Sequence, residues 1–410
     1  MALANDVFHG RLSVRGYVAS FGGLHVAALF AADDALPDYS RVRSWSSSSA
    51  RGSLVAMASE VAQLTETSLL VLAPEDERWL EFVLDHPEAL PFHHPSWARV
   101  LSESYDYRSF VLAVTDEKGR INAGMPVMEI RTRFRSPRWV SLPFTDRCPP
   151  LATDKAMTAR LVALADPARE HANVARLEVH ADLPGEDIHR RPRGVAHMLS
   201  LSRDPKLTFE RFGPQVQRNV RKAERVGLTL RRAETAEDLT ESFYRLHLRT
   251  RRRLGVPVQP RRFFDLLWRL VIATRLGFVL LAYQGKLPIA GAVFLTSGRT
   301  VVYKYGASEP SFWPLRPNNL IFWDAIRWSC ENGFAAFDFG RSDFDDRGLR
   351  KFKSGWGAVE KPLVYATVGS VPPRVGRLMG AGASVLPPLI QRSPLWLCRA
   401  IGEATYRHAA

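Results

Sequence analysis

Two distant stretches of the chain repeat one pattern of hydrophobic and polar positions. In residues 109–130, "SFVLAVTDEKGRINAGMPVMEI" has two apolar runs around a polar turn with Gly119, and in residues 277–296, "GFVLLAYQGKLPIAGAVFLT" repeats this order with Gly285 in the turn. Apolar runs bounded by turn residues predict a strand, a tight turn and a second strand. The chain is therefore expected to contain an internal repeat that opens with a β-hairpin.

The elements predicted after each hairpin also correspond. Each copy continues with a third strand, a helix whose apolar residues recur every three or four positions, a strand beyond the helix and a last strand. These elements are expected at 138–144, 154–171, 174–181 and 196–202 in the first copy, and at 300–307, 318–333, 334–341 and 362–368 in the second. The fold class predicted is α/β (α+β), with two tandem domains built alike around mixed, largely antiparallel sheets.

Four segments divide the chain. We expect a flexible N-terminal extension over 1–65, which includes the serine-rich "SWSSSSARGS", then a first domain over 66–207 and a second over 208–368. A helical C-terminal tail over 369–410 mixes apolar and basic residues. We expect this tail to pack back on the first domain, with attachment to a membrane surface as the alternative.

Charge and composition narrow the function. The chain has 410 residues and a net charge of +14, which favours polyanionic partners such as phosphates, nucleic acid or an acidic membrane surface. Its three cysteines have no paired spacing, which predicts a cytoplasmic protein, and attachment at the inner face of the membrane stays open. His93 and His94 have no cysteine or carboxylate nearby to complete a ligand set, so no metal site is predicted.

Several motifs in a fixed order resemble those of the FemAB-type tandem GNAT acyltransferases. They are "GMPV", "SLPFTDR", "QRNVRKAERVGL", "RTRRRLGVP", "YKYGAS", "RPNNLIFWDAIRW", "FDFGRS" and "LRKFKSGWGA", and the resemblance runs from about residue 70 to the C-terminus. It implies two GNAT-like domains and transfer of an acyl or aminoacyl group to an amine, with acyl-CoA or aminoacyl-tRNA as donor co-substrate and no permanently bound cofactor. The acceptor it implies is a phosphate-bearing glycan or a peptidoglycan precursor, as in the synthesis of the cell envelope or an exopolysaccharide. The donor stays open.

In the fold that this resemblance implies, the strands before and after the crossover helix splay apart around the acyl arm of the donor. Strand alternation predicts Tyr303 and Tyr305 on one face there, with Lys304 on the other. Either tyrosine can protonate a leaving group or orient a carbonyl, and Asp338 is the first candidate for a general base. The alternative is that the tyrosines only pack and that Asp338 pairs with Arg341 on a solvated rim.

The predicted donor-binding residues surround the start of the crossover helix. In "RPNNLIFW", Asn318 and Asn319 lie where backbone N–H groups are unpaired and attract anions, so a pyrophosphate or a tRNA phosphate fits there. Ser308 and Arg341, near the ends of the two splayed strands, complete this set. The alternative is that Asn318 merely caps the helix.

A further set is predicted to bind the acceptor or its phosphate: Asp146, Arg218, Arg221, Lys222, Arg350, Lys351, Lys353 and Trp356. Helical spacing gathers the basic residues at 218–222 on one helix face, which can equally be ordinary solvated surface. The cations at 350–353 are expected to be exposed, so that removing one changes binding more than folding. Trp356 either stacks on a sugar or base or fills a gap in the core.

The two copies are expected to differ in function. The first has Glu178 and His180 where the second has Asp338 and its neighbours, and it is less suited to hold a donor. The rival hypothesis for the whole chain is a protein without catalytic activity that binds RNA or an anionic glycan. Strong, salt-sensitive binding without preference for a donor would favour that rival.

Overall fold

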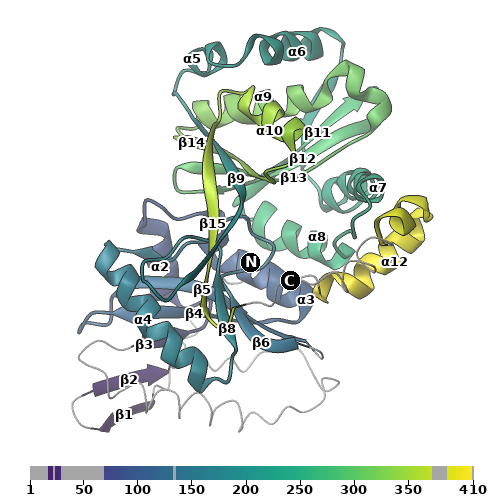
Figure 1. Cartoon of the computed structure of the whole chain (residues 1–410). Coiled ribbons are helices and arrows are strands. Elements are labelled where there is room, and N and C mark those ends of the chain that lie inside the picture. The colour runs from purple at the N-terminus through teal and green to yellow at the C-terminus, as the bar shows by residue number, and fades with distance from the viewer. Residues whose placement is uncertain (1–16, 22–23, 29–68, 133–134, 372–385, 409–410) are drawn as a thin grey trace, which may run out of the picture.

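The computed structural model describes residues 17–21, 24–28, 69–132, 135–371 and 386–408. One continuous sheet of thirteen strands runs through both halves of the protein, with helices on its faces (Figure 1). The strand order is β10-β11-β12-β13-β14-β9-β15-β8-β6-β5-β4-β3, and the short β7 pairs with β5. The serine-rich segment lies outside the described residues, but the expected flexible extension contains a separate two-stranded hairpin, β1 (Tyr17–Phe21) with β2 (Leu24–Ala28).

The repeat seen in the sequence is present in the structure. The first copy contains β4 (Arg108–Thr115), β5 (Ile121–Thr132), β6 (Arg135–Val140), α4 (Lys155–His171) and β8 (Arg176–Val179). The second contains β11 (Gly277–Gln284), β12 (Leu287–Ser297), β13 (Thr300–Ser308), α9 (Pro317–Glu331) and β14 (Ala336–Ser342). In each copy three antiparallel strands lead through a helix to a parallel strand.

The other elements extend this plan. The first half also contains β3 (Leu69–Leu72), α2 (Glu77–Asp85), α3 (Pro95–Tyr105), β7 (Leu151–Ala152) and β9 (His189–Ser200). Then follow α5 (Pro205–Glu210), α6 (Pro214–Arg225), β10 (Thr229–Arg232), η2 (Asp238–Phe243), α7 (Tyr244–Leu254), α8 (Arg261–Leu267) and η3 (Trp268–Ile272). The chain ends with α10 (Arg347–Ser354), β15 (Val359–Gly369), α12 (Leu395–Thr405) and η5 (Tyr406–His408). The mixed, largely antiparallel fold and the helical tail are thus as predicted.

The last strands of the two copies are exchanged. β9 follows the first copy in sequence but pairs with β14 of the second, whereas β15 follows the second copy and pairs with β8 of the first. The cores show the same exchange, because Leu199 of β9 packs in the cluster around Phe337 and Val368 of β15 packs in the cluster around Leu177. β9 and β15 also pair with each other along most of their length, so they join the halves (Figure 1).

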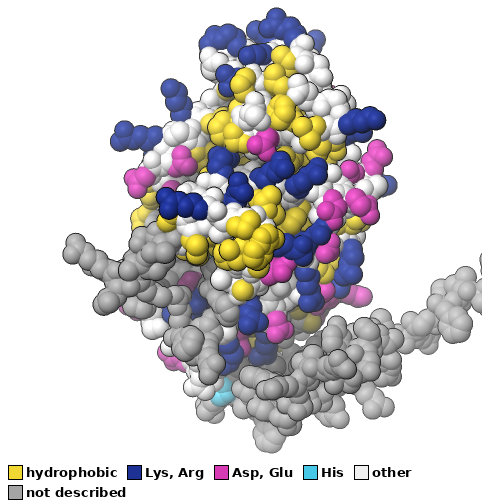
Figure 2. Space-filling model, turned by 90° about the vertical axis from the view of Figure 1, so that its right-hand side faces the viewer, with side chains coloured by type: hydrophobic (Ala, Val, Ile, Leu, Met, Phe, Trp, Pro, Cys, Tyr) yellow, Lys and Arg dark blue, Asp and Glu magenta, His cyan; other side chains and the backbone are white. Residues whose placement is uncertain are grey.

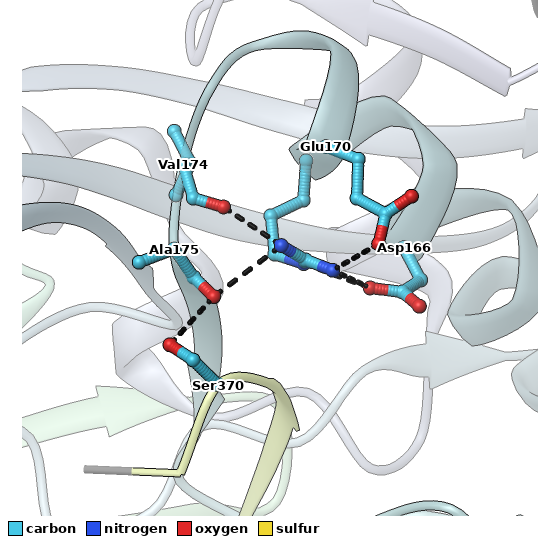
Figure 3. A network of polar contacts seen from close by, with 6 residues as sticks. Asp166, Glu170, Val174, Ala175 and Ser370 are labelled. Carbon is cyan, nitrogen blue, oxygen red and sulfur yellow. Dashed lines mark hydrogen bonds and ion pairs between the residues drawn. The ribbon is translucent and has the colours of Figure 1, made fainter. Parts of the chain in front are cut away.

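A buried arginine secures the end of β15 in the first half (Figure 3). The residues around Arg169 are Asp166, Glu170, Val174, Ala175 and Ser370. The guanidinium of Arg169 donates to the carbonyl of Ala175 at 3.3 Å, and the hydroxyl of Ser370, just after β15, donates to the same carbonyl at 2.9 Å. Gly369 has φ +86°, and a Cβ there would lie 2.7 Å from Cζ of Arg169, so only glycine fits.

A third core lies between the halves and includes the C-terminal tail. It gathers side chains of α3, α7 and α8 with Ile390, Cys398 and Tyr406 of the tail. Tyr406 stacks on Tyr105 of the first half with ring centroids 5.6 Å apart, while Gly402 lies against Val258 of the second half. The tail therefore contacts both halves. The boundaries of the two domains stay a prediction.

Candidate active site

The second copy has a point of divergence between two parallel strands. β13 and β14 pair only over Thr300–Val302 and Ala336–Asp338, after which β14 turns away through Gly340 at φ +72°. Asp338 is thus the last residue of β14 that pairs with β13, while β14 continues to pair with β9 up to Ser342. Strands that separate at their carboxyl ends create the kind of crevice in which open α/β sheets bind ligands.

Asp338 is a buried acid at this point. Its Oδ1 accepts a hydrogen bond from the backbone N–H of Gly340 at 2.8 Å, and its Oδ2 lies 3.6 Å from the guanidinium of Arg147. Burial raises the pKa of Asp338, while Arg147 and the Gly340 N–H oppose this and the charge of Asp146 adds to it. Asp146 comes from the first half, and its Oδ2 accepts the backbone N–H of Arg341 at 3.2 Å. The structure therefore brings together two acids that lie far apart in sequence.

Lys353 of α10 is the buried cation of this site. Its Nζ donates to the carbonyls of Gly340 and Arg341, at 3.0 and 2.8 Å, and the residue is only 4% exposed. Burial lowers the pKa of Lys353 to about 8, against the opposing charges of Asp146 and Asp338. The expectation that Lys353 is an exposed charge is wrong, because α10 packs with this side chain turned toward the exit of β14.

Tyr303 and Tyr305 do not share a face of the sheet, contrary to the prediction from alternation. The β12–β13 register shifts so that Tyr303 pairs with Phe294 and Tyr305 with the adjacent Val293, which leaves Lys304 as an extra residue. One extra residue in a strand reverses the alternation of side chains beyond it. Tyr303 accordingly packs in the cluster of α9, and Tyr305 packs in the cluster of α7 and α8.

The bulged Lys304 reaches toward the first half. Its Nζ donates to the carbonyl of Phe144 at 2.5 Å and lies 5.0 Å from the ring centroid of Phe92. Burial lowers the pKa of Lys304, and the charges of Asp146 and Asp338 oppose this. A second ammonium group thus lies in the field of the two acids.

Both tyrosines are close-packed. Burial raises the pKa of Tyr303 to about 12 and that of Tyr305 well above its ordinary value. The hydroxyl of Tyr303 lies against the backbone of Gly306, where a Cβ would be only 2.0 Å away. The absence of a side chain at Gly306 therefore provides the space for the Tyr303 ring.

Three of the four predicted donor-binding residues, Ser308, Asn318 and Asn319, lie at the end of β13 and the start of α9. The hydroxyl of Ser308 accepts hydrogen bonds from the side-chain amide of Asn318 at 3.3 Å and from the indole N–H of Trp313 at 2.9 Å. The amide Nδ2 of Asn319 is buried and has no hydrogen-bond partner among the described residues. Arg341 lies apart from these three, and its guanidinium pairs with Asp343.

A cavity of about 580 Å³ opens beside Ser308. Its lining residues are Arg249, Thr250, Arg252, Arg253, Ser308, Glu309, Pro310, Gln391 and Leu395, from α7, the end of β13 and the tail. Arg249 pairs with Glu309 at 3.2 Å, and the guanidinium of Arg253 lies 5.0 Å from the ring centroid of Trp313. The three arginines outnumber the one acid of the lining, Glu309, so the cavity carries a net positive charge.

The predicted phosphate-binding residues do not form one site. Arg218, Arg221 and Lys222 lie on α6, at the outer end of the second half in Figure 1, and Arg218 and Arg221 donate to glutamines of that helix. Arg350 forms a two-bond ion pair with Glu360 at 2.7 and 2.9 Å, so a phosphate would have to compete with a carboxylate. Only Lys353 and Asp146 of this set lie with Asp338.

Trp356 cannot stack on a ligand as the structure stands. It is 0% exposed and packs against Phe212, with ring centroids 5.0 Å apart, and against Phe322 at 5.7 Å. Of the two interpretations of this residue, the structure supports the core one. The indole is covered by Phe212, which lies in the segment between α5 and α6, far from Trp356 in sequence.

The corresponding divergence in the first copy is closed by its own chain. The backbone N–H of Ser141 donates to the carbonyl of Glu178 at 2.8 Å, and the Ser141 hydroxyl accepts the N–H of His180 at 2.8 Å. Cys148 then donates its N–H to the carbonyl of His180 at 3.0 Å. These bonds bridge the strands of the first copy at the level where β13 and β14 of the second are no longer paired. The division of function between the copies stays a prediction.

The sequence analysis missed Arg147, Lys304 and the three arginines of the cavity. A single lysine inside an otherwise apolar strand was a usable signal for Lys304, because an unpaired buried ammonium is unfavourable. The "RTRRR" run marked the cavity arginines by composition. Arg147 had no local signal, since its partner Asp338 belongs to the other half.

Comparison with known proteins identifies the second copy. Residues 210–354 match the family model described as an acetyltransferase (GNAT) domain. This chain carries a GNAT acetyltransferase domain. The matched GNAT domain contains the divergent strands, Asp338 and Lys353, and the predicted resemblance to FemAB-like GNAT acyltransferases is confirmed.

Solved structures show that the fold extends beyond the GNAT domain. FemX matches with a TM-score of 0.61 at 15% identity, over 74% of this chain and 97% of FemX. The C-terminal domain of a putative lysylphosphatidylglycerol synthetase from Agrobacterium fabrum matches with a TM-score of 0.50 at 15% identity, over 77% of this chain and 96% of that one. No curated protein matches this chain by sequence. The GNAT acyltransferase thus shares the FemX fold across both halves.

Proposed function

We propose that this GNAT acyltransferase moves an acyl or aminoacyl group from acyl-CoA or aminoacyl-tRNA to an amine of a cell-envelope or exopolysaccharide precursor. The observation that carries the proposal is the buried group of acids and ammonium ions at the divergence of β13 and β14. Burial shifts the pKa of Asp338, Lys304 and Lys353 there, and the charge of Asp146 contributes to all three pKa values. Acids and ammonium groups whose pKa values are shifted by burial and by neighbouring charges are typical of sites that move protons.

The chemistry assigned to these groups is nucleophilic acyl substitution. The acceptor amine attacks the donor carbonyl, so that a C–N bond forms and the C–S bond of a thioester, or the C–O bond of an ester, breaks. Asp338, whose pKa burial raises, accepts the proton that the amine loses. The ammonium groups of Lys353 and Lys304 stabilise the negative charge on the carbonyl oxygen, and Lys353, with a pKa of about 8, protonates the leaving group.

The phosphates of the donor are assigned to the start of α9. Asn319 offers an unpaired buried N–H donor, and Asn318 is held by Ser308. The arginine-lined cavity next to Ser308 adds positive charge on the same side of β13. Trp356 has no part in donor or acceptor binding. The exposed cations Arg218, Arg221, Lys222 and Lys351 are assigned to more distant phosphates of a large donor or acceptor.

The first test is whether a donor stabilises the protein. Acetyl-CoA and a mixture of aminoacyl-tRNAs are added separately, and the melting temperature is measured, because a ligand that binds only the folded state raises it. We expect one donor to raise the melting temperature and the other to have no effect. If neither donor does so and both fail to bind at micromolar concentration, the proposal is wrong.

The second test compares the two copies. Asp338→Asn keeps an oxygen to accept the Gly340 N–H but removes the base, and is expected to reduce turnover by about 100-fold or more. Glu178→Gln, the matched change in the first copy, is expected to reduce turnover less than tenfold in the folded protein. Single-turnover transfer from a radiolabelled donor measures both. Equal losses, or a larger loss for Glu178→Gln, would contradict the assignment of the site to the second copy.

A further inference from the structure

The C-terminal tail has two unlike faces. Its inner face places Ile390, Cys398 and Tyr406 in the core between the halves, each less than a tenth exposed. Its outer face presents Leu389, which is 51% exposed, and Trp396, which is 71% exposed. The inner face alone accounts for the attachment of the tail to the protein, so the outer apolar side chains need another explanation.

More exposed apolar side chains lie next to this outer face. Leu254, at the end of α7, is 53% exposed and precedes Gly255, which contacts Pro387 of the tail. Trp313 is also exposed and lies beneath the guanidinium of Arg253. Figure 2 shows hydrophobic side chains gathered on the side of the molecule that carries α7 and α12, with Lys and Arg side chains around them. We call Leu254, Trp313, Leu389 and Trp396 the apolar rim.

A basic region lies beside the apolar rim. The backbone carbonyl of Arg253 accepts a hydrogen bond from the side-chain amide of Gln391 at 3.2 Å, and Leu395, beside Trp396, lines the arginine cavity. The tail residues 386–408 contain three arginines and one glutamate, and Arg392 is exposed between Leu389 and Trp396 in sequence. Tryptophan and leucine beside arginine on one face are typical of a surface that lies in the interface of a lipid bilayer.

We propose that the apolar rim and the arginines around it dock this acyltransferase on the surface of an anionic lipid bilayer. Trp396 and Leu389 enter the headgroup region, while Arg392 contacts lipid phosphates. The arginines next to the apolar rim argue for a lipid surface over a second copy of the chain, because two copies placed rim to rim would bring these like charges together. In the described part of the chain, no helix is long and apolar enough to cross a membrane.

Vesicle co-sedimentation tests the docking. The full chain is mixed with vesicles of phosphatidylcholine alone, or of equal parts phosphatidylcholine and phosphatidylglycerol. We expect binding to the anionic vesicles only. The double variant Leu389→Ser/Trp396→Ser is expected to weaken this binding by about tenfold or more, because two apolar side chains no longer enter the interface. Arg392→Gln is expected to weaken it about fivefold.

Matched controls distinguish docking through the apolar rim from non-specific hydrophobic or electrostatic binding to vesicles. Leu84→Ser/Leu287→Ser removes two equally exposed leucines elsewhere, and Arg225→Gln removes a charge from α6; neither should weaken vesicle binding by more than about twofold. Circular dichroism and the melting temperature should match wild type for every variant, since the changed side chains are exposed.

The results that overturn the proposal are equally definite. If the tail variants still bind anionic vesicles and Arg225→Gln does not, the lipid contact lies on α6. Wild type that does not bind vesicles but forms a dimer in light scattering would also overturn the proposal. If Leu389→Ser/Trp396→Ser then dissociates that dimer, the rim is a contact between copies. Because neither measurement uses a donor or acceptor, the outcome is independent of the proposed transfer reaction.

Discussion

Replacing Lys353 by methionine is expected to remove a pH dependence from the stability of the protein. The pKa of Lys353 falls from 10.5 to about 8 on burial, so between these values the unfolded chain binds a proton that the folded protein does not. The free energy of unfolding therefore rises as pH increases through this window, by about 1.4 kcal/mol per pH unit, and the gain is lost again as pH falls from 10.5 to about 8. Methionine cannot titrate and lacks this gain.

The magnitude follows from the contacts of the ammonium group. At about pH 7, Lys353→Met loses two charge-assisted hydrogen bonds to the carbonyls of Gly340 and Arg341, each worth roughly 1.5–3 kcal/mol. It also loses the unfavourable burial of a charge, which the lowered pKa places at about 3 kcal/mol, so the net effect is a loss of about 0–3 kcal/mol of stability. At about pH 9.5 wild type should have gained roughly 2 kcal/mol over the variant.

Urea unfolding followed by tryptophan fluorescence at the two pH values measures this difference. Lys351→Met is the matched control, because Lys351 lies on the same helix but is exposed. Its difference from wild type should be the same at both pH values. If the difference in stability between Lys353→Met and wild type is the same at about pH 7 and about pH 9.5, the pKa of Lys353 is not lowered by burial. The proposed role of Lys353 in protonating the leaving group would then be wrong as well.

Two further predictions test the packing around the site. Trp356→Ala should reduce the stability by about 3–5 kcal/mol, measured by urea unfolding, yet the remaining folded protein should bind donor with unchanged affinity; a specific loss of binding would restore a ligand contact for Trp356. Gly306→Ala places a methyl group 2.0 Å from the Tyr303 hydroxyl and should lower both the melting temperature and turnover, whereas adding Tyr303→Phe should recover at least half of the lost stability. Additive effects of these two changes would mean that the residues do not compete for the same space.

The order of elements followed from local sequence patterns. Apolar runs, glycine turns and helical periodicity depend on near neighbours, and both copies of the repeat appear where they were predicted. The facing of Tyr303 and Tyr305 did not follow, because the bulge at Lys304 is set by pairing with β12 rather than by β13 alone. The sequence of one strand predicts alternating faces, but it does not show where pairing with the neighbouring strand leaves a residue unpaired.

The site itself was predicted in part. Asp338 was placed correctly at the end of a splayed strand, because its position follows from the repeat. The environment of Lys353 and Trp356 was not, since burial depends on side chains brought from elsewhere: Asp146 from the first half and Phe212 from the segment before α6. Charge and aromatic character are visible in a sequence, but the partner that covers each side chain is not.

The exchange of β9 and β15 sets an order of events during synthesis. β9 leaves the ribosome with the first half, but its neighbours in the sheet, β14 and β15, are made more than a hundred residues later. The sheet of the first half in turn waits for β15, and the match to the GNAT domain, 210–354, contains neither exchanged strand. Either half made alone would therefore carry an open sheet edge prone to pairing with other chains, so the half with the GNAT domain is expected to require its companion for solubility as well as for Asp146.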